Sequence, residues 1–161
     1  MRTLYYDFFK ENNREYLIVV SDKGLFHLTT KGFNDNNKYK LVKDEVKTSK
    51  YIDQLKEYFG GKRKVFTLPL DLEGTDFELS VWNELLKIPF GKTVSYIDVA
   101  KELGDTKKTR AVAGAIGRNP VMIVVPCHRV IGKNKKLTGY SEGLDVKEEL
   151  LRLEGITDYR I

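Results

Sequence analysis

Cysteine and histidine are nearly absent from this chain. Its 161 residues include one cysteine and two histidines. A single cysteine excludes an intramolecular disulfide, which fits a reducing intracellular compartment. A structural zinc site normally takes four protein ligands, and Cys127, His27 and His128 are the only soft ligands that the sequence offers. We therefore expect no metal centre.

Long apolar runs are missing as well. No run approaches the ~20 apolar residues that cross a bilayer, and the first thirty residues lack the basic, apolar and small-residue pattern of a signal peptide. We therefore expect no membrane association and a cytoplasmic location, on the nucleoid or, in a eukaryote, in the nucleus. The length suits one core or two small lobes.

The net charge of +5 is modest but unevenly placed. Residues 87–140 contain eleven Lys or Arg against three Asp or Glu, whereas residues 141–161 contain three against six. A basic segment beside an acidic one indicates a face that binds a polyanion. The lysines at Lys133, Lys135 and Lys136 indicate by themselves no more than a solvated surface.

Residues 1–70 alternate strand and turn patterns. The runs at 14–20 and 25–30 flank Ser-Asp-Lys-Gly and predict a hairpin, and Arg2–Phe8 predicts a third strand. Apolar residues at helical spacing predict a helix over Ser49–Phe59. A further strand is possible over Val65–Leu70. The sequence thus predicts an N-terminal α/β lobe, in which one helix covers a small antiparallel sheet.

Residues 71–161 predict a mostly helical second lobe. Its helices are expected over residues 75–88, 95–103, 106–118 and 145–154. The predicted N-terminal caps are a capping box of Thr75 with Glu78, then Ser95, then Thr106, and a second capping box of Asp145 with Glu148. The second and third helices are joined by a glycine-containing turn, which gives them helix-turn-helix form.

The third of these helices carries almost no side-chain bulk. Its small residues are Ala111, Ala113, Gly114, Ala115 and Gly117. Glycine lowers helix stability, so a bare surface indicates close approach by a partner helix or by a nucleic-acid backbone. Arg110 and the two lysines just before it favour the second interpretation, because a basic helix N-terminus binds phosphate.

The single cysteine lies in the run Pro126-Cys127-His128-Arg129-Val130. Thiolate is the reactive form of cysteine, and a neighbouring imidazole can promote it. Free cysteine is also a common packing residue, so catalysis and packing both remain open. The apolar run Val121–Val125 predicts a buried strand. Pro126 would end that strand, which places Cys127 at a strand end, a usual position for a reactive group.

Six motifs in order closely resemble the O6-alkylguanine-DNA alkyltransferase family, over about residues 65–155. They are Gly91-Lys92-Thr93-Val94-Ser95-Tyr96, Arg110-Ala111-Val112-Ala113-Gly114, Asn119-Pro120, Pro126-Cys127-His128-Arg129-Val130, Gly139-Tyr140-Ser141 and Lys147-x-x-Leu150-Leu151-x-x-Glu154-Gly155. The resemblance implies a ribonuclease-H-like N-terminal lobe over residues 1–70. It also implies a winged-helix-like DNA-binding and alkyl-transfer lobe over residues 71–161.

The resemblance implies catalytic roles for five residues. Cys127 matches the nucleophile that takes an alkyl group from O6 of guanine. His128 matches the base that deprotonates the thiol through a water, and Glu154 matches the carboxylate that orients His128. Asn119 matches a turn-bracing residue, and Tyr140 matches a donor to the leaving guanine.

The resemblance also implies docking in the DNA minor groove and flipping of the damaged nucleotide, because O6 is inaccessible inside the stack. Tyr96 would crowd the 3′ phosphate, and Arg110 would fill the vacated stack. The other implied contacts are Ala111, Gly114 and Lys133 with DNA, and Val130 and Ser141 with the base.

The implied activity is stoichiometric repair of O6-methylguanine, and of O4-methylthymine, in double-stranded DNA by a monomer without a cofactor. A thioether is a poor leaving group, so each molecule would act once. Glu142 stands where the family commonly has glycine, which predicts slower reaction with bulky groups such as benzyl. The alternatives are a non-catalytic sensor of alkylated bases, which would lack the cysteine, a helix-turn-helix regulator and a cysteine hydrolase.

Overall fold

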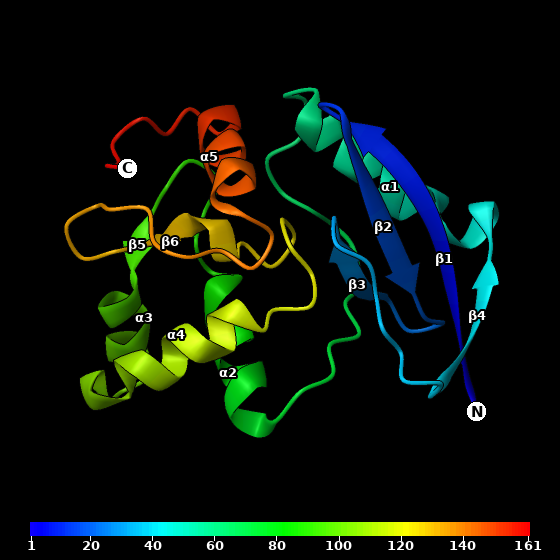
Figure 1. The fold of residues 1–161 in the computed structure, drawn as a ribbon, viewed down its shortest axis with the longest axis horizontal. Helices are drawn as coiled ribbons and strands as arrows, with labels where there is room; N and C mark the ends of the chain where they lie inside the picture. The colour runs from blue at the N-terminus through cyan, green and yellow to red at the C-terminus, as the bar shows by residue number, and fades with distance from the viewer. The chain divides into compact units, whose positions relative to one another are not determined.

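The computed structural model describes residues 1–161 and divides into two compact units, Met1–Glu73 and Gly74–Ile161 (Figure 1). The first unit contains a sheet and a helix, and the second is mostly helical. This arrangement confirms the expected mixed α/β class. None of the helices is long and apolar enough to span a membrane.

The sheet of the first unit has the strand order β3-β2-β1-β4. Its strands are β1 (Arg2–Glu11), β2 (Arg14–Val20), β3 (Leu25–Thr29) and β4 (Tyr39–Lys43). The predicted hairpin is confirmed, since β2 and β3 are antiparallel, and β1 is antiparallel to β2. Asn12 and Asn13 join β1 to β2 with φ of +51° and +62°, the two positive values that a tight two-residue hairpin turn requires.

Strand β4 was not predicted, and it makes the sheet mixed rather than purely antiparallel, because it runs parallel to β1. Its sequence, Tyr-Lys-Leu-Val-Lys, is short and half polar, and none of its side chains is fully buried. An edge strand of this kind has no strong alternation of apolar residues. Its pairing is therefore decided by the tertiary structure.

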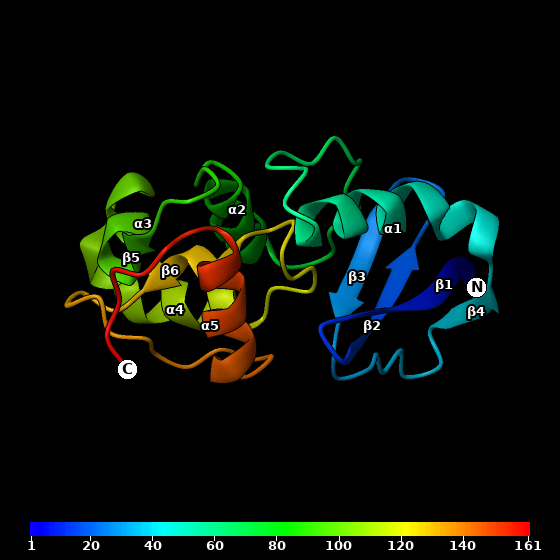
Figure 2. The ribbon, with the colours of Figure 1, turned by 90° about the horizontal axis from the view of Figure 1, so that it is seen from above.

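Helix α1 (Glu45–Phe59) covers one face of the sheet (Figure 2). It begins four residues before the predicted start, because the side chain of Asp44 accepts hydrogen bonds from the backbone N–H groups of Val46 and Lys47. Tyr51, Leu55 and Tyr58 form its buried face. The predicted strand over Val65–Leu70 is wrong: Val65 is exposed, and only Leu70 forms a bridge, with Leu25.

The second unit contains the predicted helix-turn-helix. Its helices are α2 (Asp76–Leu85), α3 (Tyr96–Glu102), α4 (Thr109–Gly117) and α5 (Leu144–Leu153). The capping box of Thr75 with Glu78 is confirmed, and Ser95 caps α3 as predicted. The short parallel strands β5 (Val94–Ser95) and β6 (Val130–Ile131) pair with each other.

Two predicted helix caps in this unit are wrong. Asp105, not Thr106, caps the turn before α4, because its carboxylate accepts a hydrogen bond from Lys107 N. Asp145 and Glu148 form no capping box, since the cap of α5 is Gly143 with φ of +108° and no side-chain hydrogen bond. Glycine adopts this positive φ without strain. The helix therefore begins at Leu144, directly after Gly143, and Asp145 lies inside its first turn and not at the cap. Helix α2 also stops at Leu85, ahead of the predicted Pro89.

The predicted buried strand over Val121–Val125 is buried but is not a strand. It is a tight turn in which Val125 N donates to Val121 O at 3.2 Å, and Ile123 has φ of +71°. An apolar run indicates burial, whereas a strand also needs a partner with free backbone groups. The side chain of Asn119 supplies the hydrogen bonds instead, from Nδ2 to Val125 O at 2.9 Å and from Val121 N to Oδ1 at 3.0 Å.

Trp82 fixes α2 against α4 in the second unit. Its side chain is 2 % exposed, and Nε1 donates to Ala115 O at 2.8 Å. We expect Trp82→Phe to lower the free energy of unfolding by about 2 kcal/mol, through the lost hydrogen bond and the cavity left behind. Urea unfolding followed by circular dichroism measures this, because Trp82 is the only tryptophan. Leu86→Ala, at an exposed site on the same helix end, is the control. Equal losses in both variants would contradict the prediction.

Candidate active site

The single cysteine lies in a buried helical turn of the second unit. Cys127 begins a 3-10 turn that extends to Arg129, and its side chain is almost inaccessible. Its N–H donates to Val125 O at 2.8 Å, so the turn braced by Asn119 leads directly into it. The thiol is therefore held by a compact turn and does not lie at the end of a strand.

His128 and Glu154 form a buried pair beside this thiol. His128 Nε2 lies 2.6 Å from Glu154 Oε2, and both side chains are fully inaccessible. Burial lowers the pKa of His128, although its hydrogen bond to Glu154 acts in the opposite direction. The neutral ring donates Nε2–H to the carboxylate. Its Nδ1, which has no hydrogen-bond partner in the protein, remains a proton acceptor.

The Glu154 carboxylate is stabilised in its ionised form. Burial by itself would raise the pKa of Glu154, but the hydrogen bonds to it outweigh burial and hold the pKa well below its usual range. The donors are His128, Arg129 Nε at 2.8 Å, Arg129 Nη2 at 3.1 Å and Gly91 N at 3.0 Å. Arg129 also donates from Nη1 to Ile88 O at 2.7 Å. The carboxylate thus joins α5 to the turn that holds Cys127.

A buried lysine also lies near the thiol. Lys147 is fully buried, and its Nζ donates to Val130 O at 2.7 Å. The ammonium lies 5.7 Å from the ring centroid of Tyr140 and 6.0 Å from that of Tyr96. Burial lowers the pKa of Lys147 to about 8, partly offset by the neighbouring Cys127. The lysine in turn favours the Cys127 thiolate.

The pKa of Cys127 reflects opposing influences. Burial raises the pKa of this thiol, whereas hydrogen bonding from Asn119 and Tyr140 and the positive charge of Lys147 lower it. Glu142 raises it by like-charge repulsion of the thiolate. Burial is the largest of these influences and keeps the pKa of Cys127 above its usual value, so the thiol needs a proton acceptor to become a thiolate.

The structure gathers only part of the predicted set around Cys127. His128, Glu154, Asn119, Tyr140 and Val130 belong to this cluster. Tyr96 is half-buried beside it, and its hydroxyl accepts a hydrogen bond from Thr138 Oγ1 at 2.9 Å. The other predicted residues are not part of this cluster, and all but Gly114 are exposed. They are Arg110, Ala111, Gly114, Lys133 and Ser141.

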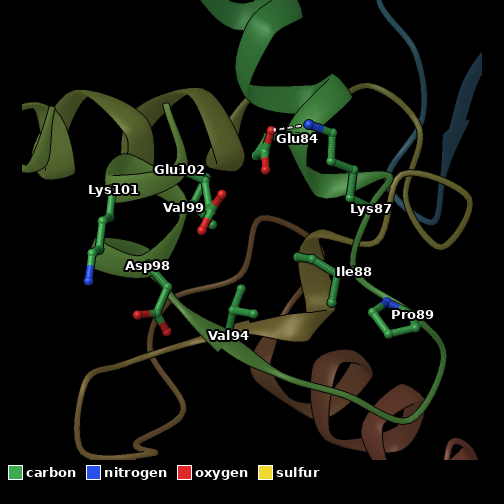
Figure 3. Close-up of a pocket in the computed structure, with 9 residues that line it drawn as sticks. All are labelled: Glu84, Lys87, Ile88, Pro89, Val94, Asp98, Val99, Lys101 and Glu102. Carbon is green, nitrogen blue, oxygen red and sulfur yellow. Dashed lines mark hydrogen bonds and ion pairs between the residues drawn. The ribbon is translucent and has the colours of Figure 1, made fainter. Parts of the chain in front are cut away.

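A cavity of about 520 Å³ lies elsewhere in the second unit, between α2, β5 and α3 (Figure 3). Ile88, Pro89, Val94 and Val99 provide its apolar lining. Its charged lining residues are Glu84, Lys87, Asp98, Lys101 and Glu102. None of the residues predicted for catalysis or DNA binding lines it. The cavity and the Cys127 cluster are therefore separate features of the unit.

Comparison with known proteins covers both units. Residues 4–72 match the model of the 6-O-methylguanine DNA methyltransferase ribonuclease-like domain, and residues 76–156 match that of the DNA binding domain of the same family. The chain belongs to the 6-O-methylguanine DNA methyltransferase family. The resemblance carried by the sequence motifs is thereby confirmed.

Relatives of this family match over nearly the whole chain. A methylated-DNA–protein-cysteine methyltransferase of Methanosarcina mazei is 44% identical over 155 residues, which are 94% of this chain and 97% of the relative. The crystal structure of the Mycobacterium tuberculosis O6-methylguanine methyltransferase has a TM-score of 0.86 at 38% identity, and the match covers 94% of this chain and 93% of that one. The expected enzyme class is confirmed with the family.

Sequence reasoning missed two residues of this methyltransferase site. Arg129 neutralises Glu154, and Lys147 lies beside Cys127. Both stand inside the quoted motifs, but an arginine or lysine in a sequence is usually solvated. For Lys147 the sequence did contain an indication of burial, because the residue lies on the apolar face of α5, between Val146 and Leu150. A charged residue on such a face is buried only when a partner accepts its hydrogen bonds.

Glu154→Gln should destabilise the protein strongly at neutral pH, because it leaves the buried Arg129 without a counter-charge. We expect a loss of about 3–5 kcal/mol in the free energy of unfolding. The loss should shrink as the pH falls below about 4.3, where the unfolded wild-type carboxyl binds a proton and the folded one does not. Unfolding at pH 7 and at acid pH measures both effects. The exposed Glu102→Gln is the control, and a pH-independent difference would contradict this account.

Proposed function

We propose that this methyltransferase repairs DNA by moving the alkyl group of O6-methylguanine, or of O4-methylthymine, onto Cys127 after the nucleotide has been flipped. The observation that carries the proposal is the buried network of His128, Glu154 and Arg129 beside the only cysteine. DNA is the proposed partner, since one related structure is the M. tuberculosis protein in complex with DNA, with a TM-score of 0.84 and 38% identity.

The proposed chemistry uses the tautomer that the geometry favours. His128 Nδ1 takes the thiol proton through a bridging water, and the resulting imidazolium is stabilised by Glu154. The thiolate attacks the methyl carbon in line. A C–S bond forms, the C–O6 bond breaks, and its electron pair goes to the guanine, which takes up a proton. Tyr140 hydrogen-bonds the departing base, Ser141 donates near O6, and the Val130 backbone contacts the base.

The bare face of α4 supports DNA docking. A Cβ added to Gly117 would meet no atom within 4 Å, and one added to Gly114 would meet only Arg118 Nη1, at 3.2 Å. Packing against another helix therefore does not explain these glycines. We propose that this face enters the minor groove, with Ala111 and Gly114 against the DNA backbone.

The residues around this face have complementary proposed roles. Arg110 at the start of α4 is exposed, and it would fill the stack from which the nucleotide is flipped. Tyr96 would crowd the 3′ phosphate. Lys133, exposed on the loop after β6, would contact a phosphate. The proposed complex contains one copy of this chain.

Mass spectrometry of the intact protein tests the chemistry. After mixing with duplex DNA that contains one O6-methylguanine, the wild type should gain one methyl group, located on Cys127, and never a second. Cys127→Ser should gain none, because the hydroxyl is a far weaker nucleophile. Lesion binding without methyl gain would favour the sensor alternative. Binding without lesion preference would favour the regulator, and more than one lesion repaired per molecule would refute single use.

Gly114→Ala should change stability and DNA affinity in opposite directions. Alanine favours the helix by up to about 1 kcal/mol, and the exposed Arg118 side chain can move aside. In the DNA complex the added methyl should weaken binding about ten-fold, as overpacking of a tight contact does. Thermal unfolding and fluorescence anisotropy with a labelled duplex measure the two effects. Asn83→Ala, at an exposed position of α2, should raise stability without weakening DNA binding. Unchanged affinity in Gly114→Ala would place the DNA on another face.

A further inference from the structure

A tight turn carries Glu142 to the edge of the Cys127 cluster. Gly143 N donates to Tyr140 O at 2.9 Å, which closes a four-residue turn with Ser141 and Glu142 at its centre. Glu142 is half-buried. It therefore shares its turn with Tyr140, whose ring lies 5.7 Å from the Lys147 ammonium, and is not part of the freely solvated acidic surface.

This turn is held at both ends. Before it, Thr138 Oγ1 donates to the Tyr96 hydroxyl at 2.9 Å. After it, Gly143 begins α5, and its carbonyl accepts from Lys147 N at 3.1 Å. Gly143 has φ of +108°, a backbone geometry that other residues adopt only with strain. The position of Glu142 relative to Cys127 is thus set by the fold.

Two charges of opposite sign lie near the thiol, at different depths. The Lys147 ammonium is fully buried, bound to the Val130 carbonyl and flanked by the rings of Tyr96 and Tyr140. The Glu142 side chain is only half-buried, and it belongs to the turn from which Tyr140 and Ser141 are proposed to contact the base. A group held there for transfer to Cys127 therefore comes near a negative charge.

We propose that Glu142 selects substrates by charge and disfavours groups that bring a negative charge to Cys127, such as a carboxymethyl adduct. For DNA lesions this inference rests on the proposed function. The reacting carbon must come within about 3–3.5 Å of the sulfur. A carboxylate on that carbon consequently enters the region where Glu142 repels the thiolate. With the screening of bulk water, two like charges about 4 Å apart repel each other by about 1 kcal/mol, which corresponds to about a five-fold difference in rate.

A pair of small thiol reagents tests the charge effect without DNA. Iodoacetamide and iodoacetate deliver the same methylene carbon to sulfur with loss of iodide, and they differ in charge. The quantity to measure is the ratio of their rates on Cys127, by intact-protein mass spectrometry. We expect Glu142→Gln to lower the iodoacetamide-to-iodoacetate ratio about five-fold. Lys147 is present in both proteins, so its attraction for iodoacetate cancels.

The matched control is Glu102→Gln, which removes the same charge from an exposed side chain at the separate cavity of Figure 3. Its ratio should equal that of the wild type. If Glu142→Gln leaves the ratio unchanged, or if Glu102→Gln lowers it equally, the inference is overturned. High salt should reduce the difference between wild type and Glu142→Gln, because the effect is electrostatic.

A second experiment applies the same comparison to DNA. Duplexes carry either O6-methylguanine or O6-carboxymethylguanine, and single-turnover transfer is measured for both. Glu142→Gln should raise the carboxymethyl rate relative to the methyl rate about five-fold. Normal methyl transfer with an unchanged relative rate would overturn the inference and leave the proposed function intact. No transfer from either lesion by the wild type would refute the proposed function, while the iodoacetate ratio would still decide the role of Glu142.

Discussion

The Glu154 carboxylate is fully buried at the end of α5, and it accepts hydrogen bonds from His128, from two nitrogens of Arg129 and from the Gly91 backbone. An isolated carboxylate in such a position would be very unfavourable. The donors compensate for burial, and in doing so they connect α5, the turn of Cys127 and the segment that follows α2. Removing any one of them would leave a buried charge or donor unsatisfied. The local structure of the site therefore depends on this one carboxylate.

The same network determines the protonation of the site. Because burial lowers the pKa of His128, the imidazole remains neutral, and with Nε2 bound to Glu154 its basic nitrogen Nδ1 is directed away from the carboxylate. Near the thiol, Lys147 supplies a positive charge and Glu142 supplies a negative one. The reactivity of the thiol is a balance among these groups, and the charge selection proposed for Glu142 is one consequence of that balance.

The second unit separates this chemistry from its proposed docking surface. The Cys127 cluster is packed inside, whereas the glycine face of α4 and the basic residues at its start are exposed. A lesion inside a duplex could reach the sulfur only after leaving the base stack. Burial of the nucleophile is thus consistent with nucleotide flipping. It also limits reaction of the thiol with other electrophiles.

Much of this arrangement could be read from the sequence. The antiparallel strands, the caps of α2 and α3, the helix-turn-helix and the cysteine beside a histidine all depend on local patterns, because turns, caps and periodicity involve residues close in the chain. The strand β4, the turn over Val121–Val125 and the burial of Arg129 and Lys147 did not follow from such patterns. The strand and the two buried charges each depend on a partner distant in sequence, namely β1, Glu154 and the Val130 carbonyl, whereas the turn depends on side-chain hydrogen bonds of the nearby Asn119 that hydrophobic periodicity does not reveal. The sequence by itself determined which chemistry was available, and only the tertiary structure decided which charges were buried together. The physical reason is that burying a charge is favourable only where the fold supplies its partner.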